Sequence, residues 1–397
     1  MHHFMSNSPW SGRGLIEALQ GDMLGSGLFS NSILIIDESA DEKSGSTAAG
    51  AGRQNNGRLG KVDMCQVGVF ASLATPETHC WVDGELFIPE KWFADDYEEK
   101  RKKVGIPTER VFQTKLELAL KLIKRAQKEG LPFDAVDMDS LYGRSFALRQ
   151  ELRQENIEYY ADIPENTLVY LNKPVITHEL KKNGEPSKKV IVVGDKAKVS
   201  DLLDHPQLES ETLCIRSTQR GYLEATFSRL PIWTVKDDQI MEEWLLIRQN
   251  QKKNVYVLSN ASSKTPLDVM AFRKTHRYFI ERDNQDSKSE FGWDEFQATK
   301  YLAWEHQLAL TIMASWFVAT TIFEWRDELG QDPELLTEYG LEELPYLSVS
   351  NVRELLRAAM PLPHLSAEQA TLLIVKHLEN RSRSRASRLR KRSKSRM

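Results

Sequence analysis

The chain has 397 residues, of which 41% are hydrophobic and 28% are charged, and its formal net charge is −4. Such a composition is ordinary for a globular protein that buries one large core or a few smaller ones. No apolar run is long enough for a membrane span, and the N-terminus has no secretory signal, so we expect neither a membrane protein nor a secreted protein. The three cysteines fit no metal-binding spacing, so we do not expect a zinc protein.

The first third of the chain begins with a segment, 1–30, that shows little structural signal. ILIID (33–37) is a continuous apolar run, which is typical of a strand covered on both faces. The glycine-rich stretch 41–63 is expected to form a loop. Two further strands are predicted at 65–74 and 78–89, on either side of a short turn.

A helix is predicted at 114–130, because leucines recur on one side of it and Gly130 follows as a stop. PFDAVDMD (132–139) is a fourth strand, and 144–156 is a further helix. The resulting order of three strands, a helix and a strand predicts an α/β core with a mixed sheet flanked by helices. Asp37 closes the first of these strands and Asp139 closes the last.

Residues 157–262 have a different pattern, with short β-type runs separated by charged or glycine-containing turns. Helices are predicted again at 266–290, at 298–325 and, finally, at 366–381. The apolar stretch within the second of these helices is interrupted by polar residues, so we expect it to be buried in the protein and not in a membrane.

Five parts are therefore expected along the chain. They are an N-terminal segment (1–30), the first part of the core (31–156), a β-rich insertion (157–262), the helical remainder of the core (263–380) and a basic tail (381–397). The tail holds nine Lys or Arg residues and no acid, and it is expected to be disordered because it has little to bury. It either binds nucleic acid through phosphate contacts or acts as a solubilising extension, and the sequence favours neither.

Three carboxylates in this pattern suggest a site for divalent metal ions. Asp37 and Asp139 would face one another if their strands are neighbours, and Glu281 would approach from a helix. Hard cations such as Mg²⁺ prefer carboxylate oxygens, and two such ions can promote cleavage of a phosphodiester. Arg277 and Lys288 share the helix face of Glu281 and are candidates to bind phosphate.

Alternatives remain open for each of these residues. An aspartate after a strand is more often a cap or turn residue, and Arg, Glu and Lys on a helix often form only a solvated face. Asp41, Asp134 and Asp137 are rival carboxylates that spacing does not exclude. The basic residues of the glycine-rich stretch either hold the DNA backbone or serve only solubility; they are Arg53, Arg58 and Lys61.

The chain also resembles a known family over about three quarters of its length. The runs that carry the resemblance are SNSPW, IIDES, GRQNNGRLGKVDMCQVGVF, ELFIPEKWFAD, VGIP, FQTKLELA, VDMDSLYG, EEWLLIRQ, VYVLSNA and the stretch from RYFIE to FGWDEFQ. They are collinear with those of the DDE transposases of bacterial insertion sequences, in the branch with a DDE-superfamily endonuclease domain.

The resemblance implies an RNase H-like core with a β-rich insertion between the second Asp and the Glu. It implies Asp37, Asp139 and Glu281 as catalytic residues and ligands of two Mg²⁺ ions, or of Mn²⁺. The family motif Tyr-x2-Arg-x3-Glu-x6-Lys maps onto Arg277, Glu281 and Lys288, but Lys274 stands at its tyrosine position.

The implied activity is cleavage and strand transfer of double-stranded DNA at the ends of the element and at a target. The implied protein is a dimer when bound to DNA, lies in the cytoplasm of a prokaryotic cell with the nucleoid, and contacts no membrane. The short region before Asp37 and the altered glycine-rich stretch favour an alternative, a catalytically impaired DNA-binding remnant or regulator. A nuclease of the same fold that hydrolyses DNA without joining strands is a further alternative.

Overall fold

The computed structural model describes residues 2–57, 59–180, 186–218, 221–249, 253–295, 297–326 and 347–359, and a few isolated positions after these. The predicted helix at 366–381 lies largely outside the described residues, and the basic tail lies wholly outside them. The chain divides into two units, Met1–Val349 and Ser350–Met397. The second unit holds α11 (Val349–Ala359) apart from its first residue, and the first unit holds everything discussed below.

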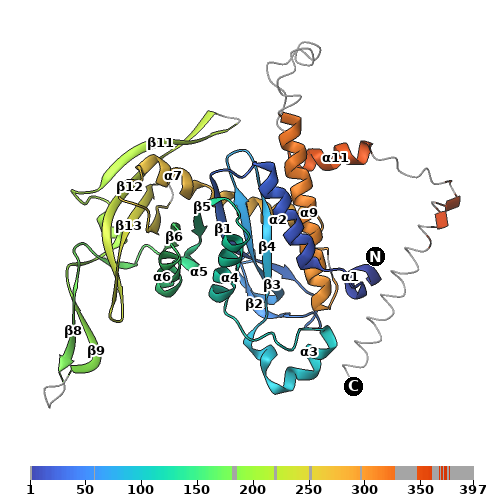
Figure 1. Ribbon diagram of the computed structural model, residues 1–397, viewed down its shortest axis with the longest axis horizontal. Coiled ribbons are helices and arrows are strands. Elements are labelled where there is room, and N and C mark those ends of the chain that lie inside the picture. The colour runs from blue at the N-terminus through green and yellow to red at the C-terminus, as the bar shows by residue number, and fades with distance from the viewer. Residues whose placement is uncertain are drawn as a thin grey trace, which may run out of the picture. The chain divides into compact units, whose positions relative to one another are not determined.

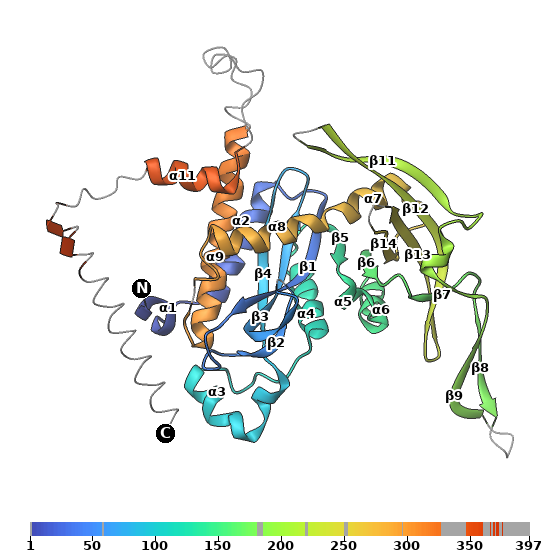
Figure 2. The same ribbon diagram turned by 180° about the vertical axis from the view of Figure 1, so that it is seen from behind.

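The first unit contains the strands shown in Figures 1 and 2. They are β1 (Ser32–Glu42), β2 (Gly52–Asn56), β3 (Lys61–Ala74), β4 (His79–Phe87), β5 (Phe133–Met138), β6 (Tyr159–Ile163), β7 (Leu168–Tyr170), β8 (Val175–Leu180), β9 (Pro186–Val193), β10 (Lys196–Lys198), β11 (Glu209–Thr218), β12 (Gly221–Lys236), β13 (Gln239–Gln249) and β14 (Val255–Ser259). Apart from the separate hairpin β8–β9, they form one sheet in the order β10-β7-β12-β13-β14-β6-β5-β1-β3-β2, with β11 paired to β12 and β4 to β3. The pairs β1–β5 and β5–β6 are parallel.

Helices flank both faces of this sheet. They are α1 (His2–Asn7), α2 (Gly12–Ser26), α3 (Glu98–Val104), α4 (Lys115–Lys128), α5 (Ser140–Gly143), α6 (Phe146–Gln154), α7 (Leu267–Thr275), α8 (Arg277–Ser289) and α9 (Tyr301–Glu324). Residues of α2, α4 and α9 share a core with one face of β1, and residues of α7 and α8 share a core with the other. The expected mixed α/β fold, a mixed sheet flanked by helices, is confirmed.

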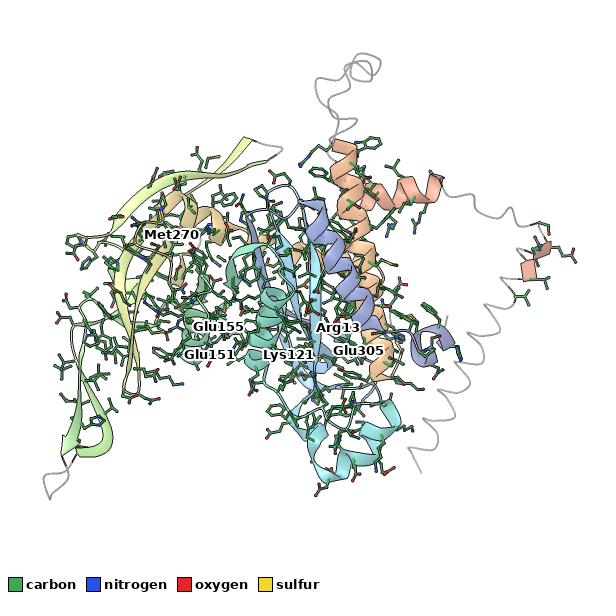
Figure 3. All side chains as sticks on the ribbon, in the orientation of Figure 1. Arg13, Lys121, Glu151, Glu155, Met270 and Glu305 are labelled. Carbon is green, nitrogen blue, oxygen red and sulfur yellow. The ribbon has the colours of Figure 1, made fainter. Side chains whose placement is uncertain are left out.

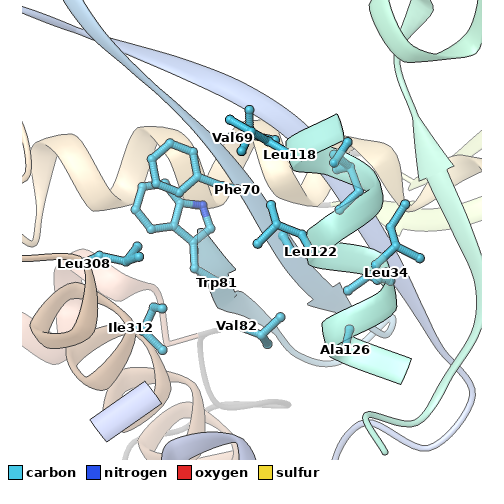
Figure 4. Close-up of a cluster of buried hydrophobic side chains, with 14 of the residues drawn as sticks. Leu34, Val69, Phe70, Trp81, Val82, Leu118, Leu122, Ala126, Leu308 and Ile312 are labelled. Atoms are coloured by element: carbon cyan, nitrogen blue, oxygen red, sulfur yellow. The ribbon is translucent and has the colours of Figure 1, made fainter. Parts of the chain in front are cut away.

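The apolar start of β1 is covered on both faces, as predicted. Leu34 and Ile36 point into the core with α4, Ile33 and Ile35 point into the core with α7 and α8, and all four are fully buried. Such a run contributes to two cores at once because side chains alternate along a strand. Figure 4 shows the first core, in which residues of β1, β3, β4, α4 and α9 meet; labelled are Leu34, Val69, Phe70, Trp81, Val82, Leu118, Leu122, Ala126, Leu308 and Ile312.

The N-terminal segment is more ordered than the sequence indicated, because α2 packs against α9. The glycines of α2 lower its helix propensity, but one of them is needed there: a Cβ on Gly12 would lie 2.9 Å from the carbonyl oxygen of Glu305. His306 of α9 stacks on Trp10 with ring centroids 3.8 Å apart, and its two ring nitrogens contact the carbonyl oxygens of Met5 and Trp10. Tertiary contacts thus outweigh weak local propensity here.

Helix α9 is long and apolar enough to cross a membrane by length and composition. In the structure, however, its residues Trp304, Leu308, Ile312 and Trp316 are buried in the core that contains α4. The expectation that this helix is buried in the protein is confirmed.

Two predicted elements differ from the structure. The stretch 41–63 is not one loop, because β1 continues to Glu42 and β2 forms an edge strand whose Gln54 donates to the carbonyl oxygen of Cys65 at 3.1 Å. The predicted helix at 266–290 is two helices that meet at His276, where backbone hydrogen bonds of the i→i+3 type replace the α-helical pattern. No glycine or proline marks that break.

The predicted strands of 157–262 are present, and all of them except β9, which pairs with β8 in a separate hairpin, continue the sheet of the core. Strand β6 pairs in parallel with β5, and β14 pairs with β6, so the β-rich region is joined to the core through hydrogen-bonded strands. The five-part division of the chain stays a prediction.

Buried carboxylates along β4 are paired with cations, of which Arg13 and Lys121 are labelled in Figure 3. Asp83 and Glu85 are buried carboxylates. Arg13 of α2 binds Asp83 at 2.9 Å, and Arg125 and Lys121 of α4 bind Asp83 and Glu85 at 2.6 and 2.8 Å. Burial would raise the pKa of Glu85, but Arg125, Arg110 and Lys121 lower it to about 2. The network ties α2 and α4 to the sheet that carries the candidate site.

Candidate active site

Asp37 and Asp139 come together where the pairing of two strands ends. Strands β1 and β5 run in parallel, and the last residues in register are Ile36 and Met138. The next residue of β1 is Asp37, and Asp139 follows directly after β5, where it caps α5 by accepting the backbone N–H of Leu141 at 2.8 Å. The expectation that the two strands are neighbours is confirmed.

A third carboxylate, Glu38, joins the two aspartates. Among the described residues, Asp37, Glu38 and Asp139 form a group whose ligand oxygens lie within 4.8 Å of one another. Sequence reasoning missed Glu38, because alternation along β1 assigns it to the face opposite Asp37. The only feature of the sequence that could have indicated Glu38 is its position next to Asp37. Both residues follow Ile36, the last residue of β1 that pairs with β5.

The three carboxylates of this group repel one another, and their surroundings raise the pKa values of both aspartates. Burial raises the pKa of Asp37, Arg277 lowers it, and Asp139 and Glu38 raise it again, so that the net pKa is about 7. The pKa of Asp139 is also raised, by burial and then by Glu38. Carboxylates held this close need a cation to stay ionised together.

The predicted residues of the second half of the chain lie on α8 and face the same cleft. This cleft has a volume of about 930 Å³, and its lining includes Asp37, Glu38, Asp139, Arg277, Glu281 and Lys288. Glu281 lies outside the three-carboxylate group, and its side chain is 57% exposed. The structure thus brings Glu281 to the cleft but does not place its oxygens with the other carboxylates.

The two cations of α8 have protein partners. Arg277 lies 3.4 Å from Asp162 of β6 and 3.7 Å from Glu281, and Lys288 donates to the carbonyl oxygen of Ala40 at 2.8 Å. Burial would lower the pKa of Arg277, but Asp162, Asp37 and other carboxylates raise it, so its charge is strongly favoured. A fixed positive charge therefore stands at the cleft beside the carboxylates.

Lys274, at the motif's tyrosine position, is buried beneath the cleft. Its Nζ atom lies 2.6 Å from Asp137 and 2.8 Å from Asp162. Asp162 therefore links Lys274 to Arg277, and the end of α7 is tied to β5 and β6. Burial raises the pKa of Asp137 to about 7, although Lys274 opposes the shift.

The rival carboxylates all have cationic partners. Asp137 binds Lys274, Asp134 binds Arg273 at 3.1 Å, and Asp41 is paired with Lys43. None of the three belongs to the carboxylate group found among the described residues.

Two of the predicted DNA-contacting residues, Arg53 and Lys61, lie on the β2–β3 hairpin, whose Asn55 and Gly57 line the cleft. Arg53 is exposed on β2. Lys61 forms an exposed ion pair with Asp63 at 3.1 Å. Arg58 lies outside the described residues. Contact of these cations with DNA stays a prediction.

Helix α8 is also fixed to β4 by polar contacts. His79 Nδ1 lies 2.6 Å from Asp283 Oδ1, and Trp81 Nε1 donates to Asn284 Oδ1 at 3.1 Å. These contacts hold the helix that presents Arg277 and Glu281.

We expect the His79–Asp283 pair to stabilise the fold more in mild acid than in alkali. Burial would lower the pKa of His79, but Asp283 raises it above its ordinary value. The contribution is then complete below about pH 6.5 and is lost as the pH rises through the raised pKa. The His79→Gln change should therefore reduce the free energy of unfolding, measured with urea, by more at about pH 6 than at about pH 9. An equal loss at both pH values would contradict the pairing.

Two comparisons with known proteins find similar sequences. The family model for the DDE superfamily endonuclease matches residues 1–220, a range that contains Asp37, Glu38 and Asp139 but ends before Glu281. A probable transposase for insertion sequence element IS701 from Microchaete diplosiphon is 28% identical over 320 residues, which cover 76% of this chain and 69% of that relative.

Proposed function

Because the chain belongs to the DDE superfamily of endonucleases, we propose that it is the transposase of an insertion sequence, with Asp37, Asp139 and Glu281 as its catalytic carboxylates. The observation that carries the proposal is the meeting of Asp37 and Asp139 at the ends of parallel neighbouring strands, in a cleft that Glu281 also lines. The likeness to a probable insertion-sequence transposase supports it.

The donor set suits Mg²⁺ or Mn²⁺. All the ligand atoms are carboxylate oxygens, and they lie within 4.8 Å of one another. This spacing is close to the separation of about 4 Å between oxygens on opposite sides of one Mg²⁺. Burial, and after it the charges of Asp139 and Glu38, raise the pKa of Asp37 to about 7 against the opposing charge of Arg277, so a divalent cation here would favour its ionised form. When bound, a pair of divalent ions would supply Lewis-acid polarisation of the phosphate and stabilise charge on the attacking and leaving oxygens.

Each residue of α8 has a role in this proposal. Glu281 lines the cleft with a largely exposed side chain and would complete the acidic site. Arg277, held by Asp162, would bind a phosphate of the DNA backbone, and Lys288 would bind another.

The proposed reaction has two phosphoryl transfers. A water oxygen bonds to phosphorus at the end of the element while the bond from phosphorus to the 3′ oxygen breaks, which frees a 3′ hydroxyl. That hydroxyl then bonds to a phosphorus of target DNA and displaces the 3′ oxygen of the target, so no covalent protein intermediate is needed.

The fold also supports the assignment of an RNase H-like core and an insertion. Strands β1, β3, β4, β5 and β6 with α4 would be the RNase H-like core, and the β-rich region between Asp139 and Glu281 would be the insertion. We propose double-stranded DNA as the partner, a dimer when two ends are paired, and action at the bacterial nucleoid in the cytoplasm.

The test is a plasmid that carries the genomic flanks of this gene, incubated with the protein in Mg²⁺. We expect cleaved ends with 3′ hydroxyls and strand-transfer products joined to target DNA, and neither product when EDTA removes the metal. Cleavage without joining would favour a hydrolytic nuclease instead. Binding without cleavage in Mg²⁺ or Mn²⁺ would favour the impaired DNA-binding form and contradict the proposal.

A further inference from the structure

Glu38 has no role in the reaction proposed above, yet its carboxylate lies with those of Asp37 and Asp139. It extends from the face of β1 that packs against α4, and its Oε1 atom is 3.1 Å from Lys115 at the start of α4. Its side chain is 24% exposed, so it is held in place by its surroundings and does not project into solvent.

The second oxygen of Glu38, Oε2, is buried and accepts no hydrogen bond. The neighbouring hydroxyl of Tyr142 is buried and also has no hydrogen-bond partner among the described residues. Burial, followed by the charge of Glu38, raises the pKa of this hydroxyl. A buried carboxylate oxygen without a donor is unfavourable. A divalent cation, or water bound to one, would satisfy it.

Glu281 does not fill this place in the structure. It is absent from the three-carboxylate group, and its side chain is largely exposed and nearest to Arg277. Without DNA, the group that is ready to bind a cation therefore contains Glu38 in place of Glu281.

We infer that Glu38 is a ligand of the active-site metal, directly or through bound water; this inference rests on the proposed function. Asp37, Glu38 and Asp139 would then hold the first divalent ion before DNA binds. Lys115 then competes with this ion for Glu38. Glu281 is not needed to hold the first ion and acts only once the DNA is in the cleft.

The experiment measures Mn²⁺ binding to the full-length protein without DNA, by titration calorimetry and by the paramagnetic resonance signal of free Mn²⁺. We expect Glu38→Gln to weaken Mn²⁺ binding about 10- to 100-fold. Lys115→Met should tighten binding a few-fold, because the competing cation is gone. Glu281→Gln should change binding by less than about twofold on the same reasoning, and Glu42→Gln, an exposed glutamate on the same strand, serves as the matched control.

The substitutions of Glu38 and Lys115 distinguish two roles for Glu38, that of a metal ligand and that of a residue that only anchors α4. If Glu38 only anchors α4, both changes lower thermal stability alike and neither changes Mn²⁺ affinity, which overturns the inference. The inference also fails if the unmodified protein binds no Mn²⁺ without DNA, or if Glu281→Gln weakens binding while Glu38→Gln does not. If Asp37→Asn and Asp139→Asn leave binding intact as well, the metal site itself, and with it the proposed function, fails.

Discussion

Replacing Asp139 by Asn is expected to slow DNA cleavage in Mg²⁺ by about 10³-fold or more, which corresponds to about 4 kcal/mol of lost transition-state stabilisation. The change removes one negative oxygen from the three-carboxylate group and with it the charge that holds the metal. Asn caps a helix as well as Asp does, so the bond from Leu141 N–H is retained and the fold should be unaffected. The rate of plasmid nicking and the unfolding midpoint are the two measurements.

The matched control is Asp134→Asn, at the opposite end of the same strand. Asp134 is 38% exposed and pairs with Arg273 away from the cleft, so we expect nicking at the rate of the unmodified protein. Equal rates for Asp139→Asn and the unmodified protein would show that the carboxylate of Asp139 takes no part in cleavage.

Replacing Lys274 by Met is expected to lower the free energy of unfolding by about 3–5 kcal/mol, because it leaves buried carboxylates without their cation. Lys274 contacts Asp137 at 2.6 Å and Asp162 at 2.8 Å, and Asp137 is fully buried. The remaining cation, Arg277, contacts only Asp162 of the two, at 3.4 Å. Urea unfolding of the full chain at neutral pH measures the loss.

Two further variants test the physical reason for this loss. Lys264→Met removes an exposed lysine just before α7 and should change the free energy of unfolding by less than about 0.5 kcal/mol. Adding Asp137→Asn to Lys274→Met removes the most deeply buried carboxylate and should recover part of the stability. If the double variant is less stable than Lys274→Met alone, the loss does not come from unpaired buried charge.

The sequence was most informative where structure depends on near neighbours along the chain. The apolar run before Asp37 predicted a strand buried on both faces, and the leucine periodicity at 114–130 predicted α4, whose capping box of Thr114 and Glu117 sets its start. Arg277, Glu281 and Lys288 were predicted on one helix face and all line one cleft. Strand alternation and helical periodicity are local properties, so they can be read from the residues alone.

The tertiary structure decided which carboxylates share a site. Glu38 was not among the predicted site residues, because alternation along β1 places it on the face opposite Asp37. Asp41, Asp134 and Asp137 resembled Asp37 and Asp139 in sequence but have cationic partners in the fold. The partners of Asp134 and Asp137, Arg273 and Lys274, come from α7, more than a hundred residues away, and the break between α7 and α8 lies beside them. These features depend on pairing and burial between distant segments, which local sequence patterns do not encode.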